Sequence, residues 1–239
     1  MRVTFCVPYR GGDDEYRDRN WKCVRQWLDT HHSGWPIVMG TDTGEPFNPA
    51  RARNDAAKKA GDWDVAVFVD SDTLVHPETM REAVQLAADT DQMVIAGNAK
   101  IYMDAGSTQL FLDTGLMFPT PTDWPDTRRQ RFTFDDKSVY RDPCSGVVVV
   151  SRPVWEATGG YLHNADPNDS YEDLIFFACC EIFAGLTRTP GMQLHLWHPA
   201  AQRYRGANHR TYQRLQQIKR RPHAQQLARD YLTELGHKV

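Results

Sequence analysis

A continuous apolar run, Val65–Val69, is the feature that most constrains the fold of this 239-residue chain. A run without polar alternation is typical of a strand that is covered on both faces. Other short apolar runs, each interpreted as a strand, lie at 3–8, 36–40, 92–97, 147–150 and 193–198. Helical patterns separate them at 15–30, 49–60, 77–88, 152–158 and 172–184. This alternation predicts an α/β fold with a mainly parallel central sheet flanked by helices.

Two stretches depart from the alternation. Residues 99–142, rich in Asp, Thr, Pro and Arg, predict an irregular or antiparallel excursion that forms one wall of a ligand site. Residues 199–239 contain nine Lys and Arg but only two acidic residues, and they predict an amphipathic helix at 212–235. Such a tail could hold phosphates, nucleic acid or an acidic partner, or could be a solvated helix face. We expect a main domain over residues 1–198, made of a nucleotide-binding half at about 1–98 and an acceptor or catalytic half at about 99–198. The basic extension is expected over residues 199–239.

Composition argues against several classes of protein. No apolar run approaches the roughly 18–20 residues that a membrane-spanning helix needs. The N-terminus also lacks the apolar stretch and cleavage site of a signal peptide. The five cysteines include no C-x-x-C pair, which argues against a zinc site. Buried free thiols in a reducing cytosol are the simplest interpretation, so we expect a soluble cytoplasmic protein.

Two carboxylates, Asp70 and Asp72, directly follow the central apolar run, with Ser71 between them. At a strand end both can turn toward one point, where they repel each other unless a cation neutralises them. A hard divalent ion does this and can also bridge diphosphate oxygens. The alternative is a solvated turn before the next helix. The position after a buried strand favours the metal site.

A second group of possible ligands is the segment His195–His198, which has a histidine at each end. At strand spacing, positions 195 and 198 point to opposite faces, so only one of them would reach the metal. His198, at the strand end beside Pro199, is therefore the predicted ligand. His195 is expected to be a core residue or to lie outside the coordination sphere.

These residues belong to a longer ordered set of segments: Val7–Arg10, Phe47–Asn54, Phe68–Asp72, Cys144–Val147, Trp155–Tyr161, Glu172–Asp173 and His195–His198. In order and spacing, the set resembles the GT-A class of nucleotide-sugar glycosyltransferases. The resemblance is nearest to family 2 and to the relatives that make polypeptide N-acetylgalactosamine and β-1,4-galactose linkages. It covers Val3 to Pro199 and implies a GT-A fold, here followed by a C-terminal helical extension.

The resemblance implies a role for each matching position. Asp72 and His198 would bind the metal directly, and Asp70 would hold the ribose or reach the metal through water. The implied donor is a UDP-sugar and the implied ion is Mn2+ or Mg2+. Two arginines in the loop after His198, Arg203 and Arg205, are expected to approach the diphosphate. The implied nucleotide-sugar pocket also includes Pro8, Tyr9, Arg10, Asp42, Arg53, Ser71 and Gly146.

The chemistry of such a donor assigns a role to one more pair of residues. Sugar transfer leaves a diphosphate, and a metal stabilises the charge that builds on this leaving group. If the sugar inverts, the acceptor hydroxyl needs a base, and Asp173 at the start of the 172–184 helix is the candidate. Glu172 would orient the acceptor. The alternative for both residues is simply a favourable position at a helix N-terminus.

We therefore expect a metal-dependent glycosyltransferase, hexosyl or N-acetylhexosaminyl, that transfers a single sugar. Polymer synthesis is not expected, because the chain lacks membrane helices and the Q-x-x-R-W motif of processive synthases. A nucleotidyltransferase and a non-catalytic nucleic-acid or carbohydrate-binding module are the alternatives. Gly11 and Gly12 weakly suggest the first, and the basic tail and seven tryptophans suggest the second. The acceptor is left open among a protein, a glycan, a small molecule and a modified DNA base.

Overall fold

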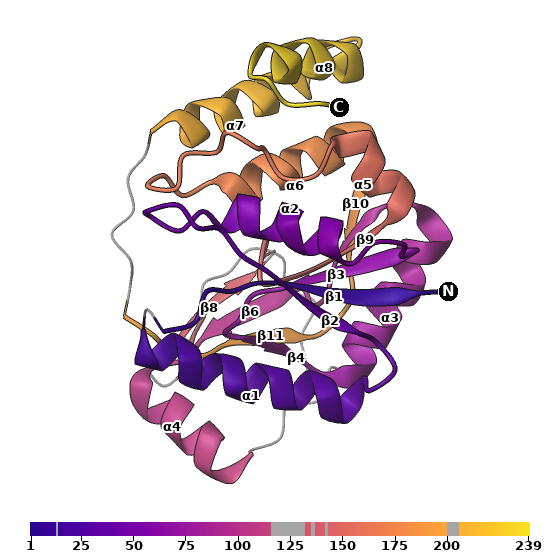
Figure 1. Ribbon diagram of the computed structural model, residues 1–239. Coiled ribbons are helices and arrows are strands. Elements are labelled where there is room, and N and C mark those ends of the chain that lie inside the picture. The colour runs from indigo at the N-terminus through magenta and orange to yellow at the C-terminus, as the bar shows by residue number, and fades with distance from the viewer. Residues whose placement is uncertain (13, 116–131, 135–136, 142, 200–205) are drawn as a thin grey trace.

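The main sheet passes through the centre of the molecule (Figure 1). The computed structural model describes residues 1–12, 14–115, 132–134, 137–141, 143–199 and 206–239. Within them, the main sheet has six strands in the order β10-β5-β9-β3-β1-β2. Neighbours are parallel except β9, which runs antiparallel to β3 and β5. The bounds are β1 Val3–Pro8, β2 Ile37–Gly40, β3 Val65–Val69, β5 Met93–Ile95, β9 Val147–Ser151 and β10 Leu186–Arg188. The predicted α/β architecture is confirmed.

Helices cover both faces of this sheet, which explains the unbroken apolar sequence of β3. Ala66 and Phe68 belong to one hydrophobic cluster, with residues of α2, α5 and α6. Val65, Val67 and Val69 belong to the other cluster, with residues of α1 and α3. Each face of β3 is therefore dry, and a polar side chain on either face would be desolvated. The bounds are α1 Glu15–His31, α2 Pro49–Lys59, α3 Pro77–Thr90, α5 Arg152–Thr158 and α6 Glu172–Phe183.

A smaller sheet adjoins the carboxyl end of β3. In the described residues it has the order β4-β11-β6-β8-β7, with β11 parallel to β6 and antiparallel to β4. The β6, β8 and β7 strands pair antiparallel, as expected for the 99–142 excursion. That excursion also contains a helix we did not predict, α4, whose N-cap Asp104 accepts from the Ser107 amide. The bounds are β4 Thr73–Val75, β6 Ala99–Tyr102, α4 Ala105–Thr114, β7 Phe132–Phe134, β8 Lys137–Arg141 and β11 Met192–His195.

The C-terminal region is two helices, α7 (Ala207–Ile218) and α8 (Ala224–Glu234), so the single helix predicted at 212–235 is wrong. Pro222 lacks the N–H that a continuous helix would need, and His223 adopts a left-handed φ of 58°. Both helices pack near α6 at the top of Figure 1. Their apolar residues join the same cluster as α6. The division at residue 198 stays a prediction.

Two composition-based expectations can be compared with the structure. All five cysteines are free thiols, as expected, and Cys6, Cys179 and Cys180 are buried. Across the described residues, we find no helix that combines the length and the apolar character needed to cross a membrane.

Candidate active site

A cleft of about 840 Å³ opens at the carboxyl ends of β1 and β3, where the two sheets meet. This volume is in the range of small-molecule sites. The location is the one expected for ligand binding in an open α/β sheet. Most of the predicted site residues line the cleft, namely Pro8, Tyr9, Arg10, Arg53, Asp70, Ser71, Asp72, Glu172, Asp173 and His198. Segments far apart in the sequence are thus brought to one place.

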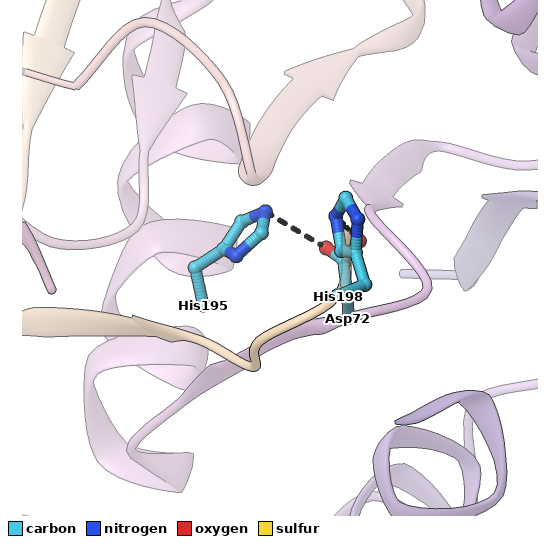
Figure 2. A group of neighbouring side chains, drawn as sticks. All are labelled: Asp72, His195 and His198. Atoms are coloured by element: carbon cyan, nitrogen blue, oxygen red, sulfur yellow. Dashed lines mark ion pairs between the residues drawn. The ribbon is translucent and has the colours of Figure 1, made fainter. Parts of the chain in front are cut away.

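Three side chains in the cleft form a possible metal site: Asp72, His195 and His198 (Figure 2). Oδ1 of Asp72 lies 3.5 Å from Nε2 of His195, and Oδ2 lies 3.2 Å from Nε2 of His198. One ligand atom from each residue lies within 4.8 Å of the others. Two imidazoles and one carboxylate, converging and largely buried, are a donor set suited to a first-row transition metal. The residues present therefore fit the ion that the sequence implied.

The two histidines stabilise the charged form of Asp72 against burial. Burial by itself would raise the pKa of Asp72, but His195 and His198 outweigh it and hold that pKa well below its usual range. Burial lowers the pKa of His195, which favours the neutral imidazole that a metal requires. Around His198, Arg17 Nη2 lies 3.4 Å from Nδ1, and the Pro199 carbonyl oxygen lies 2.8 Å from the same atom. These contacts leave Nε2 facing Asp72.

The expectation that His195 and His198 point to opposite faces is wrong, because the strand ends earlier than predicted. β11 stops at His195. The Leu196 amide then donates to the Asp72 carbonyl, at 2.8 Å, and the Trp197 amide donates to Thr108 Oγ1, at 2.8 Å. The Asn20 side chain holds the Trp197 carbonyl at 3.0 Å. The chain therefore leaves the sheet and turns both rings toward Asp72.

Asp70 lies outside this three-residue cluster. Its Oδ1 lies 2.7 Å from Nη2 of Arg53, and its amide donates to the Gly146 carbonyl at 2.8 Å. The prediction that Asp70 reaches the metal, or holds the ribose, stays a prediction. Ser71, which separates the two aspartates in the sequence, is buried and lines the cleft.

Two carboxylates, Glu172 and Asp173, project from the first turn of α6 toward Arg53. Oδ1 of Asp173 lies 2.9 Å from Arg53 Nη1, and Oε1 of Glu172 lies 3.6 Å from the same atom. Burial raises the pKa of Asp173 to about 7, against the opposing charge of Arg53, and the neighbouring Glu172 adds to the rise. A carboxyl group with a pKa near neutrality is well matched to accept a proton from a hydroxyl during a reaction.

The opposite end of the cleft is formed by the loops that follow β1 and β2. Tyr9 donates its hydroxyl hydrogen to Asp18 Oδ1 at 2.6 Å. Arg10 donates to the Gly44 carbonyl at 3.0 Å, and its guanidinium lies 5.4 Å from the centre of the Phe47 ring. Asp42 does not line the cleft in the described residues; its Oδ2 accepts from the Asn48 amide at 3.1 Å. Asp42 therefore orders the loop beside the predicted nucleoside pocket.

Lys100 lines the cleft and was missed by sequence reasoning. It lies on β6, is only 3% exposed, and carries a charge that affects both Asp72 and Asp173. A lysine inside a short, otherwise apolar strand was the signal that could have revealed it. Gly146, with φ of 100°, makes room for it: a Cβ there would lie 2.9 Å from Lys100 Nζ and would overlap Gln193 Oε1. Arg203 and Arg205 lie outside the described residues.

The sequence model of glycosyl transferase family 2 matches residues 12–153, which are more than half of the chain. The chain belongs to this family. The match includes the Asp72 segment and Arg53, whereas the Asp173 and His198 segments lie beyond it. No curated protein sequence matches the chain.

Solved structures confirm the GT-A fold for this family 2 member. A variant of Drosophila β-1,4-galactosyltransferase 7, in complex with manganese, UDP-Gal and xylobiose, superposes with a TM-score of 0.54 at 15% identity. The alignment covers 92% of this chain and 80% of that one. TarS from S. aureus, in complex with UDP-GlcNAc, has a TM-score of 0.51 at 12% identity, over 97% of this chain and 72% of the other. At these identities the likeness concerns the fold.

Proposed function

We propose that this glycosyltransferase transfers a single hexosyl or N-acetylhexosaminyl unit from a UDP-sugar to an acceptor hydroxyl. The observation that carries the proposal is a single cleft that holds three possible metal ligands and, beside them, the partly buried carboxylate of Asp173, whose pKa burial raises to about 7. Family 2 membership supports sugar transfer over the alternative of nucleotidyl transfer. The Drosophila and S. aureus relatives are both known with a UDP-sugar bound, which supports the same donor class here.

We propose that Asp72, His195 and His198 hold a divalent ion, which would stabilise negative charge on the departing diphosphate. Two imidazole ligands favour Mn2+ over Mg2+, because nitrogen donors bind first-row transition ions more strongly than they bind magnesium. The manganese in the Drosophila relative's complex agrees with this choice. Lys100, on the same wall of the cleft, supplies a second positive charge for the diphosphate.

We propose Asp173 as the base of an inverting reaction. The acceptor oxygen forms a bond to the anomeric carbon while the bond from that carbon to the diphosphate oxygen breaks. The acceptor proton passes to the Asp173 carboxylate. Glu172, on the same turn of α6, would accept a hydrogen bond from a second acceptor hydroxyl and so orient the acceptor.

The first experiment measures release of UDP from UDP-Gal, UDP-Glc, UDP-GlcNAc and UDP-GalNAc, with Mn2+, with Mg2+ and with EDTA. We expect Mn2+-dependent release from at least one donor, and its loss in Asp72→Asn. The matched control is Asp29→Asn, an exposed position on α1. Binding of UDP with Mn2+ is followed in parallel by calorimetry. Absence of both metal-dependent UDP binding and UDP release would overturn the proposal.

The acceptor is identified in a second step. The donor that is turned over is incubated with candidate proteins, glycans, small molecules and modified DNA, and products are screened by mass spectrometry for the mass of one added sugar. We expect addition of one unit and no polymer. A ladder of successive additions would contradict single transfer.

A further inference from the structure

Arg53 occupies an unusual position for a residue expected to line a nucleoside pocket. It lies on α2, its side chain is 5% exposed, and its guanidinium group contacts carboxylates from two other elements. Nη2 lies 2.7 Å from Asp70, at the end of β3, and Nη1 lies 2.9 Å from Asp173, at the start of α6. Arg53 thus connects the segment that carries the metal ligand Asp72 with the segment that carries the candidate base.

The contacts of Arg53 depend on the shape of a guanidinium group. Its planar fork can reach two carboxylates at once, whereas a lysine ammonium is a single point of charge. The plane is further restrained by Tyr161, whose ring centre lies 5.0 Å from the guanidinium carbon. Tyr161 is itself fixed, because it is stacked on Phe176 of α6 with ring centres 4.2 Å apart. The Arg53 side chain, which projects from α2, is therefore held between the end of β3 and the start of α6.

The charge balance around Asp173 rests on few groups. Glu172 and Asp70 oppose its ionisation, and Arg53 and, more weakly, Lys100 favour it. Arg53 is the only one of these cations within ion-pair distance of Asp173 among the described residues. Without it, three partly buried carboxylates would share one region with no adjacent cation, and at least one of them would bind a proton at neutral pH.

We propose that Arg53 is a positioning residue, which favours the ionised form of the Asp173 carboxylate and fixes its orientation relative to the metal-binding segment through Asp70. The proposal rests on the proposed function in taking Asp173 as the base. It assigns Arg53 to the catalytic side of the cleft, in place of the nucleoside contact that the sequence suggested. Arg53 would affect the reaction by acting on Asp173, and it need not touch the substrate.

The test compares Arg53→Lys and Arg53→Met with the wild-type protein, and uses Lys58→Met, an exposed position on the same helix, as the matched control. For UDP release we expect kcat to fall about 10- to 100-fold in both Arg53 variants. The acidic limb of the pH–rate profile should shift to higher pH, by about one pH unit. The affinity for UDP with Mn2+ should stay within about twofold. Lys58→Met should match wild type in all three measurements.

A second readout does not need turnover. The Asp173 carboxyl group is titrated by 13C NMR in protein labelled at the aspartate side chains, with Asp173→Asn used to assign its signal. We expect the Asp173 pKa to rise in Arg53→Lys, which retains a positive charge and is the variant expected to fold if Arg53→Met does not. An unchanged Asp173 titration would overturn the proposal.

The outcomes separate this proposal from the proposed function. If the Arg53 variants lose affinity for UDP while the acidic limb of the pH–rate profile stays in place, Arg53 is a contact of the nucleoside pocket and the proposal is wrong. If the wild-type protein releases no UDP from any donor, the proposed function fails, and the NMR titration still decides whether Arg53 controls the ionisation of Asp173.

Discussion

Nε2 of His198 lies 3.2 Å from Oδ2 of Asp72, although the two residues follow strands of different sheets. Asp72 follows β3 of the main sheet, and His198 follows β11 of the smaller one. The possible metal site therefore lies where the two sheets meet. The strand β4, which begins directly after Asp72, pairs with β11 and fixes this junction.

The first prediction concerns the ligands. We expect His195→Ala and His198→Ala each to weaken Mn2+ binding by more than about tenfold, because even the loss of a residue outside the coordination sphere costs roughly 10- to 100-fold. Binding is measured by electron paramagnetic resonance of free Mn2+. His31→Ala, at an exposed position of α1, should bind like wild type. Full affinity in His195→Ala would leave His198 and Asp72 as the protein ligands and restore the interpretation based on strand spacing.

The proposed ligand His195 shows where prediction from the sequence reached its limit. Val65–Val69 predicted a buried strand, and Asp72 at its end was placed correctly in the cleft, since both inferences depend on local pattern. The orientation of His195 depends on where β11 ends, and that is decided by hydrogen bonds from residues far away in the sequence, Thr108 and Asn20. No local pattern contains that information.

The same limit applies to charge partners. Arg53 and Asp173 were both predicted as site residues, but no spacing in the sequence predicts that they contact each other, because the contact joins α2 to α6. The local pattern could mark Lys100 as unusual, but its place in the cleft depends on the pairing of β6 with β11, which joins segments far apart in the sequence. By contrast, the break between α7 and α8 was within reach of the sequence, because Pro222 lies inside the predicted helix and should have ended it.

A second prediction concerns Asp173. We expect Asp173→Asn to lower kcat about 10²- to 10⁴-fold while UDP binding is retained, because the amide cannot accept the proton. With the pKa of Asp173 raised to about 7, wild-type activity should rise with pH up to about 7 and then level off, since the base must be ionised. The variant should lack this limb. A profile that is flat from pH 5 to pH 8 in the wild type would argue against Asp173 as the base.

Lys100 provides a third prediction, on donor binding. Lys100→Met should weaken UDP binding about 10- to 100-fold, the equivalent of the roughly 1.5–3 kcal/mol of a hydrogen bond to a charged group. Uridine, which carries no phosphate, should bind the variant and the wild type equally. Calorimetry with both ligands makes the comparison. Equal losses for uridine and UDP would show that the substitution had disturbed the cleft as a whole.

The fourth prediction concerns stability where α7 begins. Oδ2 of the buried Asp169 accepts from the backbone amides of Gly206, Asn208 and His209, at 2.8, 2.6 and 3.2 Å. Asp169 thus caps α7 from a distant loop, and Asp169→Ala should lower the free energy of unfolding by about 2 kcal/mol. Urea unfolding measures the change. Asp230→Ala, on the exposed face of α8, should change it by less than about 0.5 kcal/mol.

The last prediction concerns His32, which ends α1 beneath an aromatic cluster. Its ring is stacked on Trp35 with centres 4.6 Å apart, and Nε2 is buried with no hydrogen-bond partner among the residues that the structure describes. Burial, with some repulsion from Arg81 and His31, lowers the pKa of His32 to about 4. The unfolded chain binds a proton at this histidine below about pH 6.5, whereas the folded protein does not until about pH 4. Stability should therefore decrease as the pH falls through this window.

The expected contribution of His32 is a loss of about 2 kcal/mol between pH 7 and pH 5. His32→Phe keeps a ring against Trp35 and removes the titrating nitrogen. Urea unfolding of both proteins at the two pH values isolates the effect, because all other groups titrate alike in the two proteins. The wild type should lose about 2 kcal/mol more than the variant over this range. An identical pH dependence would mean that His32 takes up its proton in the folded protein as readily as in the unfolded chain, which the burial of its ring argues against.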